Sequence, residues 1–170
     1  MRSLCCILLA VLILNSCKND DSKELTTTYY FIRHAEKDRS NPSERDPELT
    51  EKGHQRAAFW AKHFAEIPLD AVYSTNYKRT TSTAVQTAIS KALKVQLYDP
   101  RNLNDSLFVK NTKGKTVLVV GHSNTTPAFV NAVLGEEKYE DIDDSNNGNL
   151  YTVTIKGEIK SAEVQRLNPN

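Results

Sequence analysis

Residues 29–40, YYFIRHAEKDRS, carry an aromatic and apolar run straight into an Arg-His pair and then into polar, turn-forming residues. Together with the threonines before it, the run has the composition of a β-strand over 26–32. Arg33 and His34 follow where this strand is expected to end. A buried strand that stops on two ionisable side chains indicates that its end forms the floor of a polar site.

Strand and helix patterns alternate along the rest of the chain. The pattern predicts a helix within 49–67, a strand at 70–76, a helix at 77–93, strands at 95–98 and 116–123, a helix at 126–135 and a final hairpin. Thr50 is expected to cap the first helix, while Thr126, Pro127 and Gly135 mark the start and end of the last one. The hairpin is expected to turn around Lys156 and Gly157.

This alternation predicts an α/β domain of three layers, in which helices flank a mostly parallel sheet that ends in a C-terminal hairpin. The run at 116–123 is rich in β-branched residues, which is typical of a strand buried on both faces. Parallel sheets bind ligands at the C-terminal ends of their strands. Polar clusters at 33–34, 74–79 and 121–123 lie at such ends. We therefore expect them to meet in one site.

Four motifs, in this order, resemble the histidine phosphatase (phosphoglycerate mutase-like) superfamily: RHAEK at 33–37, LTEKGHQRA at 49–57, YSTNYKRTTSTA at 73–84 and GHSN at 121–124. The resemblance covers nearly the whole predicted domain, and the small size is similar to that of the phosphohistidine phosphatases. The usual opening motif is Arg-His-Gly, whereas Ala35 replaces the glycine here. This change is mild unless the position needs a positive φ.

The resemblance implies a phosphoglycerate mutase-like fold and a metal-independent phosphatase, without a cofactor, that hydrolyses phosphomonoesters or phosphohistidine. It implies that His34 is the nucleophile and becomes a phosphohistidine, while Arg33, Arg79 and His122 bind the phosphoryl oxygens. These residue types suit the chemistry, because a phosphoryl group in transfer spreads negative charge over three oxygens and arginine offers a charged planar fork. Two arginines beside His34 also disfavour its imidazolium form.

The sequence leaves the general acid open. The resemblance implies a carboxylate after the third strand, where Asp99 lies. Glu36, two residues after His34, is the rival, and Asp105 is a third candidate. A bound phosphate would raise the pKa of a nearby carboxyl group, which suits a proton donor.

Residues 1–17, MRSLCCILLAVLILNSC, contain an uncharged, mainly aliphatic run that is shorter than a membrane-spanning helix. They read as a secretory signal, and LNSC resembles a bacterial lipoprotein box in which Cys17 is lipidated. We expect a signal peptide over 1–16, a tether over 17–25 and a phosphatase domain over 26–170. The protein would be exported and held on the periplasmic or cell-surface side of a membrane through its lipid.

Charge and cysteine content limit the other function classes. The sequence has 22 basic and 21 acidic residues, so removal of Arg2 with the signal leaves a formal charge of zero. This balance argues against a nucleic-acid partner, which favours a basic surface. The cysteines are Cys5, Cys6 and Cys17, so the predicted domain has no thiol nucleophile. The expected substrate is a phosphorylated small molecule or a phosphoprotein.

Other readings of these residues are weaker. His54 and His63 are nine residues apart on one predicted helix and point to opposite sides, so they cannot share a metal. The acidic segment 141–150 lacks EF-hand spacing and reads as a turn-rich loop. Two functional alternatives stay open: a catalytically weak lipoprotein that binds phosphate or a partner, and a mutase.

Overall fold

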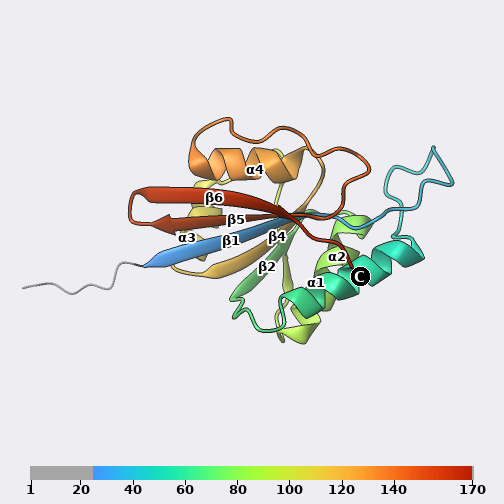
Figure 1. Cartoon of the computed structure of the whole chain (residues 1–170), viewed down its shortest axis with the longest axis horizontal. Coiled ribbons are helices and arrows are strands. Elements are labelled where there is room, and N and C mark those ends of the chain that lie inside the picture. The colour runs from blue at the N-terminus through green and yellow to red at the C-terminus, as the bar shows by residue number, and fades with distance from the viewer. Residues whose placement is uncertain (1–24, 170) are drawn as a thin grey trace, which may run out of the picture.

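The computed structural model describes residues 25–169, and these form alternating strands and helices (Figure 1). The elements are β1 (Thr26–Arg33), α1 (Glu51–His63), β2 (Ala71–Ser74), α2 (Lys78–Ser90), β3 (Val95–Leu97), α3 (Ser106–Thr112), β4 (Thr116–Gly121), α4 (Thr125–Leu134), β5 (Asn149–Lys156) and β6 (Ile159–Arg166). The predicted signal peptide, the predicted lipidation site Cys17 and nearly all of the predicted tether lie outside the described residues. Within residues 25–169, no helix combines the length and apolar character that crossing a bilayer requires.

One six-stranded sheet forms the centre of the domain, in the order β3-β2-β4-β1-β5-β6. The first four strands are parallel, and β5 and β6 are antiparallel to their neighbours. The two-residue turn between β5 and β6 makes the predicted C-terminal hairpin. This arrangement confirms the predicted α/β class with a mostly parallel sheet.

Helices cover both faces of the sheet and so produce three layers (Figure 1). On one face, Trp60 and Phe64 from α1 and its end pack with Ala84 and Ala88 of α2 against the sheet. On the other face, Phe108 of α3 and the apolar residues of α4 pack with β1, β4 and β5. The central strand β4 is buried over residues 117–121, which agrees with its β-branched composition.

The predicted element boundaries are correct to within a few residues, with two corrections. Thr50 caps α1 as expected, because its side chain accepts a hydrogen bond from the Gly53 amide. The last helix begins earlier than predicted, with Asn124 at the N-cap, and the buried Thr126 hydroxyl donates to the carbonyl of Ile32 instead of capping. The short helix α3 was not predicted, and the Asp105 carboxylate caps it through the amide of Phe108.

Candidate active site

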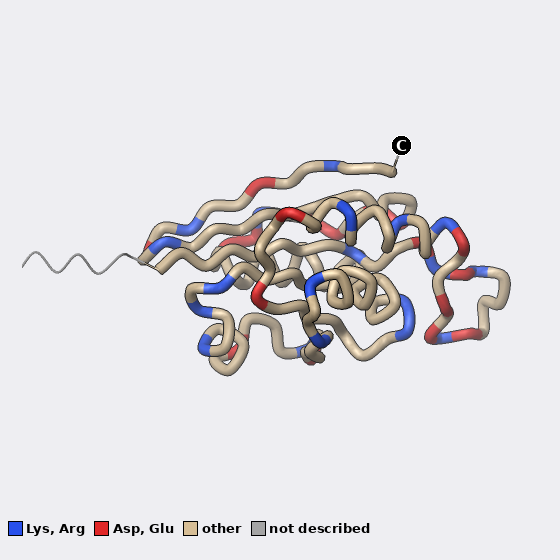
Figure 2. Tube along the Cα trace, turned by 90° about the horizontal axis from the view of Figure 1, so that it is seen from below, with Lys and Arg blue, Asp and Glu red and all other residues tan. Residues whose placement is uncertain are grey.

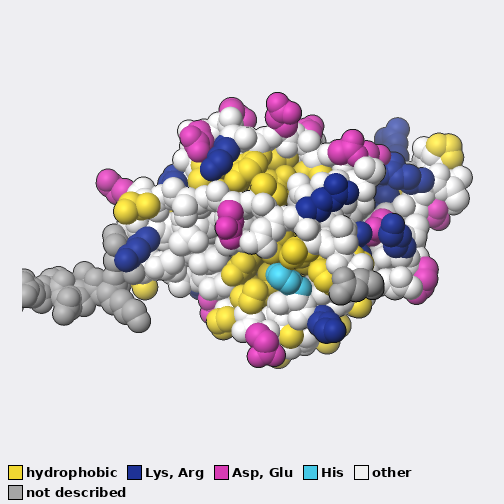
Figure 3. All heavy atoms as spheres, viewed as in Figure 1, with side chains coloured by type: hydrophobic (Ala, Val, Ile, Leu, Met, Phe, Trp, Pro, Cys, Tyr) yellow, Lys and Arg dark blue, Asp and Glu magenta, His cyan; other side chains and the backbone are white. Residues whose placement is uncertain are grey.

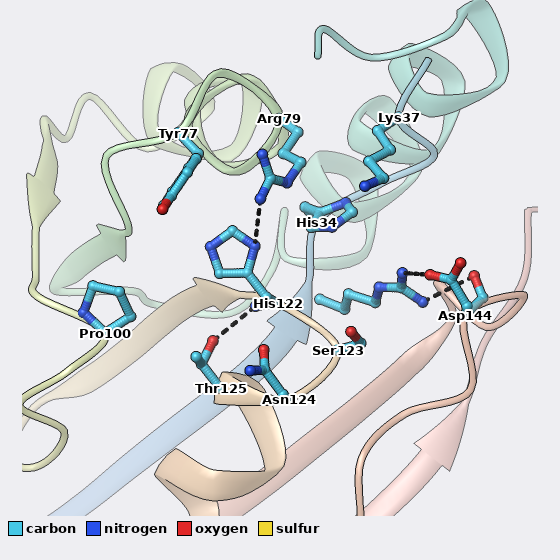
Figure 4. A pocket seen from close by; sticks show the side chains of 11 residues that line it. His34, Lys37, Tyr77, Arg79, Pro100, His122, Ser123, Asn124, Thr125 and Asp144 are labelled. Atoms are coloured by element: carbon cyan, nitrogen blue, oxygen red, sulfur yellow. Dashed lines mark hydrogen bonds and ion pairs between the residues drawn. The ribbon is translucent and has the colours of Figure 1, made fainter. Parts of the chain in front are cut away.

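The C-terminal ends of β1, β2 and β4 meet at a pocket of about 320 Å³ (Figure 4). Arg33 pairs with Gly121 in the sheet register, and the His34 amide donates to the carbonyl of Gly121 at 2.9 Å. These bonds bring the two predicted motifs side by side. The pocket is lined by Arg33, His34, Lys37, Tyr77, Arg79, Pro100, His122, Ser123, Asn124, Thr125 and Asp144.

His34 is only 3% exposed, and one of its ring nitrogens is held by the backbone. Nδ1 lies 2.7 Å from the carbonyl oxygen of Ala35. A carbonyl oxygen only accepts hydrogen bonds, so Nδ1 carries the proton and Nε2 keeps a free lone pair. Burial, together with the nearby positive charge of Arg33 and Arg79, lowers the pKa of His34 to about 3 and keeps the ring neutral.

Ala35 fits its position without backbone strain. It is fully buried, and its amide donates to the hydroxyl of Thr83 in α2 at 2.9 Å. Among residues 25–169 the positive-φ residues other than glycine are Ala92 and Asn104, so Ala35 does not require the left-handed conformation that favours glycine. Alanine is therefore accommodated where the Arg-His-Gly motif has glycine.

His122 faces His34 across the pocket, with ring centroids 5.6 Å apart. Nδ1 of His122 lies 3.3 Å from the guanidinium of Arg79, which only donates, and Nε2 lies 2.9 Å from the hydroxyl of Thr75. Nδ1 therefore accepts and Nε2 donates. Burial, with the charge of Arg79 and Arg33, lowers the pKa of His122 to about 4.

Each arginine of the pocket is held by a carboxylate from a distant loop. The buried guanidinium of Arg33 donates to Asp144 at 2.6 Å and to the carbonyls of the loop over residues 143–146. Arg79 donates to Asp46 at 3.2 Å. Within the described residues, the buried Nε atoms of both arginines lack a hydrogen-bond partner. Two oriented N–H groups are therefore available for an anionic ligand.

Lys37 adds a further positive charge to the wall of the pocket (Figure 4). Its backbone is fixed by a bridge to Leu49, and burial, followed by the charges of Arg39 and Arg79, lowers its pKa. No carboxylate within ion-pair distance of Lys37 is found in the described part of the chain. Lys37, Arg33 and Arg79 make the pocket suitable for an anion with several negative oxygens.

Neither of the two main acid candidates lines the pocket. Asp99 is half exposed and forms an ion pair with Arg101 at 2.7 Å, and the hydrogen bonds from Arg101 lower its pKa to about 2. Burial acts to raise the pKa of Glu36, but the hydrogen bonds from Arg56, a backbone hydrogen bond and the charges of Arg56 and Lys52 together outweigh it, and the net pKa is lowered. Both carboxylates are therefore ionised near neutral pH, and the geometry gives no support to a proton-donor role for either.

Sequence reasoning missed several residues that shape the pocket. Asp46 and Asp144 belong to loops whose paths the sequence pattern does not determine. Asn147 donates to the His34 carbonyl at 2.8 Å and thereby links the loop before β5 to the site. The run of acidic and amide residues at 141–150 was the available signal, but it suggested only a turn-rich loop. Among residues 25–169 there is no group of three His, Cys, Asp or Glu side chains arranged to hold a metal.

With this geometry established, comparison with known proteins shows which proteins the chain is similar to. The family model described as histidine phosphatase superfamily (branch 1) matches residues 29–105. Residues 29–105 are thus similar to branch 1 of the histidine phosphatase superfamily. This segment carries Arg33, His34 and Arg79, whereas His122 follows it. Phosphoserine phosphatase 1 of Hydrogenobacter thermophilus is 39% identical over 70 residues, which cover 38% of this chain and 33% of that enzyme.

Solved structures of similar fold cover more of the chain. The putative phosphohistidine phosphatase SixA from Agrobacterium tumefaciens has a TM-score of 0.59 at 21% identity, covering 84% of this chain and 99% of that one. YhfR of Bacillus stearothermophilus has a TM-score of 0.64 at 18% identity, covering 82% and 96%. At these identities the similarity shows a shared phosphoglycerate mutase-like fold.

Proposed function

We propose that this chain is a metal-independent phosphatase that hydrolyses phosphomonoesters or phosphohistidine through a phosphohistidine intermediate on His34. The observation that carries the proposal is the hydrogen bond from Nδ1 of His34 to the Ala35 carbonyl, at 2.7 Å. It leaves Nε2 unprotonated in a pocket lined by Arg33, Arg79 and Lys37. A neutral imidazole among cations is suited to attack on an anionic phosphorus centre.

In the proposed first step, the lone pair on Nε2 forms a bond to phosphorus while the bond from phosphorus to the leaving group breaks. Arg33 and Arg79 would stabilise the phosphoryl oxygens through the N–H groups that are free in this structure. A phosphate dianion beside His122 would favour its protonated form, which can donate to a phosphoryl oxygen. Water then attacks the phosphohistidine and releases inorganic phosphate and neutral His34.

The carboxylates around the pocket favour substrates with good leaving groups. Asp144 is the one pocket-lining residue with a carboxyl group, and the hydrogen bonds from Arg39 and Arg33 lower its pKa to about 2. Since no lining carboxyl is protonated at neutral pH, we infer that the leaving group departs without strong acid assistance. Aryl phosphates and phosphohistidine meet this condition better than alkyl phosphates.

We also propose that the enzyme is exported and attached to a membrane through a lipid on Cys17. The proposal is supported by the uncharged, mainly aliphatic segment at 3–16, which ends in LNSC at 14–17. Growth with a radiolabelled fatty acid tests it: the wild-type chain is expected to take up the label and Cys17→Ser is not. A labelled Cys17→Ser chain would contradict the proposal.

Phosphatase turnover on para-nitrophenyl phosphate with EDTA present tests the proposed chemistry. The wild-type domain should hydrolyse the substrate and His34→Ala should not. His54→Ala is the control and should remain active, because His54 is an exposed residue of α1. Loss of wild-type activity in EDTA would contradict metal independence. Full activity of His34→Ala would contradict the proposal that His34 is the nucleophile.

A further inference from the structure

Three segments meet at the end of the molecule opposite the pocket, where β1 begins and β5 turns into β6 (Figure 1). Leu25 lies next to Gly114, since a Cβ on that glycine would be 3.3 Å from the Leu25 side chain. A β1 amide donates to the carbonyl of Lys115 at 2.9 Å. On the other side of β1, Lys156 pairs with the first residue of the strand and with Ile159 across the hairpin.

This end exposes apolar and basic side chains together. Leu25 is 62% exposed and Ile159 is 73% exposed, so two large aliphatic side chains lie at the surface of this end. The lysine end, as we name it, consists of Leu25, Lys113, Lys115, Lys156 and Ile159. Its lysines are exposed and have no ion-pair partner among residues 25–169, although Glu158 occupies the hairpin turn. Figure 3 shows yellow, dark blue and magenta side chains together beside the grey atoms.

The position of the chain before Leu25 suggests what this end contacts. The described part of the chain begins at Leu25, so any attachment upstream joins the domain at the lysine end. Figure 2 shows blue Lys and Arg positions at the end of the tube where the described chain begins. Residues 17–24 span at most about 29 Å when fully extended. An anchor at Cys17 would therefore hold the lysine end near the bilayer, where lysines attract anionic headgroups and exposed aliphatic side chains enter the interface.

We propose that the lysine end docks onto an anionic lipid bilayer and turns the pocket away from the membrane. The affinity of the lysine end for lipid would add to the attachment through the covalent anchor, because a tethered surface meets the bilayer at a high effective concentration. Docking at this end places the C-terminal ends of β1 and β4, and hence His34, on the side open to water. The substrate would then reach the pocket from solution and not from the membrane surface.

Binding of a chain that starts at Lys18 to vesicles tests the surface without the lipid anchor. The buried residues of the core clusters lie within residues 29–153 and the partly buried residues packed against them extend to Leu167, so removing the first 17 residues removes none of them. We expect binding to vesicles of phosphatidylcholine with phosphatidylglycerol and at least tenfold weaker binding to phosphatidylcholine alone. Equal binding to both, or binding to neither, would overturn the proposal.

A charge-matched pair of variants locates the contact. Lys113→Glu with Lys156→Glu should lower the partition onto anionic vesicles at least tenfold. Arg45→Glu with Arg166→Glu changes the net charge by the same amount, at exposed positions away from the lysine end. This second pair should lower the partition onto anionic vesicles less than threefold. An equal loss for both pairs would mean that net charge alone drives binding, and would overturn the proposed surface.

The orientation is tested with a fluorescent label, since residues 18–170 contain no cysteine. A polarity-sensitive dye on Ile159→Cys should shift to shorter wavelength on anionic vesicles, whereas the same dye on Ser43→Cys should not. A shift at both positions, or only at position 43, would contradict the orientation. Phosphatase assays of the same chains report separately on the proposed chemistry, so either proposal can fail without the other.

Discussion

The proton on His34 illustrates how single residues control the site. The Ala35 carbonyl holds Nδ1–H, and burial with the neighbouring cations keeps the ring neutral, so the folded-state pKa of about 3 lies far below the ordinary value of 6.5. The unfolded chain therefore binds more protons between these two values, and folding stability must fall as the pH decreases through this window.

This pKa shift gives a measurable prediction. Lowering the pH from 7.5 to 5 should cost the wild type about 2 kcal/mol of unfolding free energy through His34 alone. Over the same pH interval, the unfolding free energy of His34→Gln should fall by about 2 kcal/mol less than that of the wild type, because the glutamine side chain does not titrate. Urea unfolding at the two pH values provides the measurement. An identical pH dependence for both proteins would show that His34 is not buried in its neutral form.

The lack of a protonated carboxyl group beside the pocket predicts a steep dependence on the leaving group. Asp99 and Glu36 are both paired with arginines, and Asp144 is paired with two. Across a series of aryl and alkyl phosphates, log kcat/KM should fall steeply as the leaving-group pKa rises. Asp99→Asn should leave this slope unchanged. A shallow slope that becomes steep in Asp99→Asn would establish Asp99 as the proton donor after all.

The sequence could predict the position of a site residue only where that residue lies at the end of a strand. Arg33, His34 and His122 follow strands, and parallel strands bring their C-terminal ends to one edge, so composition and order were sufficient to predict their proximity. The orientation of Asp99 was not predictable, because the neighbouring Arg101 captures its carboxylate within a local turn. Pro100, and not Asp99, consequently lines the pocket.

At the scale of elements, the loop before α1 also completes α2. Tyr77, the N-cap residue of α2, provides no side-chain cap, and the Asp46 carboxylate instead accepts from the Lys78 amide at 3.0 Å and from Arg79. One carboxylate thus caps a helix and orients a proposed phosphate-binding arginine. The dual contact couples the loop over 37–48 to the pocket.

Replacing Asp46 should therefore affect stability and binding together. Asp46→Ala is expected to lower the unfolding free energy by about 1 kcal/mol, the usual value of a lost helix cap. It should also weaken competitive inhibition by inorganic phosphate several-fold, because Arg79 is no longer held. Asp38→Ala removes an exposed carboxylate that bonds within its own turn and serves as control. Unchanged inhibition in Asp46→Ala would contradict the coupling.

Close packing between α1 and the segment after β1 explains why residue 53 is a glycine. A Cβ at this position would lie 2.2 Å from the backbone oxygen of Glu36, which accepts from the amide of Thr50. Gly53→Ala should destabilise the protein by about 1–3 kcal/mol through overpacking, although alanine is intrinsically the better helix former. Gln55→Ala, at an exposed position of the same helix, is the control. Stabilisation by Gly53→Ala would contradict the close approach.

Elements with strong periodicity or composition were predictable, and those held by tertiary contacts were not. The β-branched run of β4 and the small residues of α2 carry their own signals. The seven residues of α3 are too few for a helical period, and their helix depends on Asp105 at the N-cap and on the burial of Phe108. The loop over 141–147 is fixed by the guanidinium of Arg33, which lies more than 100 residues away in the sequence.

At the scale of the whole molecule, the fold separates two surfaces. The pocket lies where the parallel strands end, and the lysine end lies where β1 begins and where β5 turns into β6. The chain enters at the second surface and therefore leaves the first one free. This separation follows from the four parallel strands, whose C-terminal ends lie on one side of the domain and whose N-terminal ends lie on the other. It would allow the proposed tethered enzyme to present its site to solution.

Detection of a phosphoryl group on His34 tests the central claim most directly. The wild-type domain would be mixed with excess para-nitrophenyl phosphate and quenched in base, which preserves phosphohistidine, and its peptides would be analysed by mass spectrometry. The account predicts one phosphoryl group on the peptide that contains His34, and none on that peptide in His34→Ala. A turning-over enzyme whose phosphoryl group is found on another residue, or whose His34 stays unmodified under rapid quench, would contradict it.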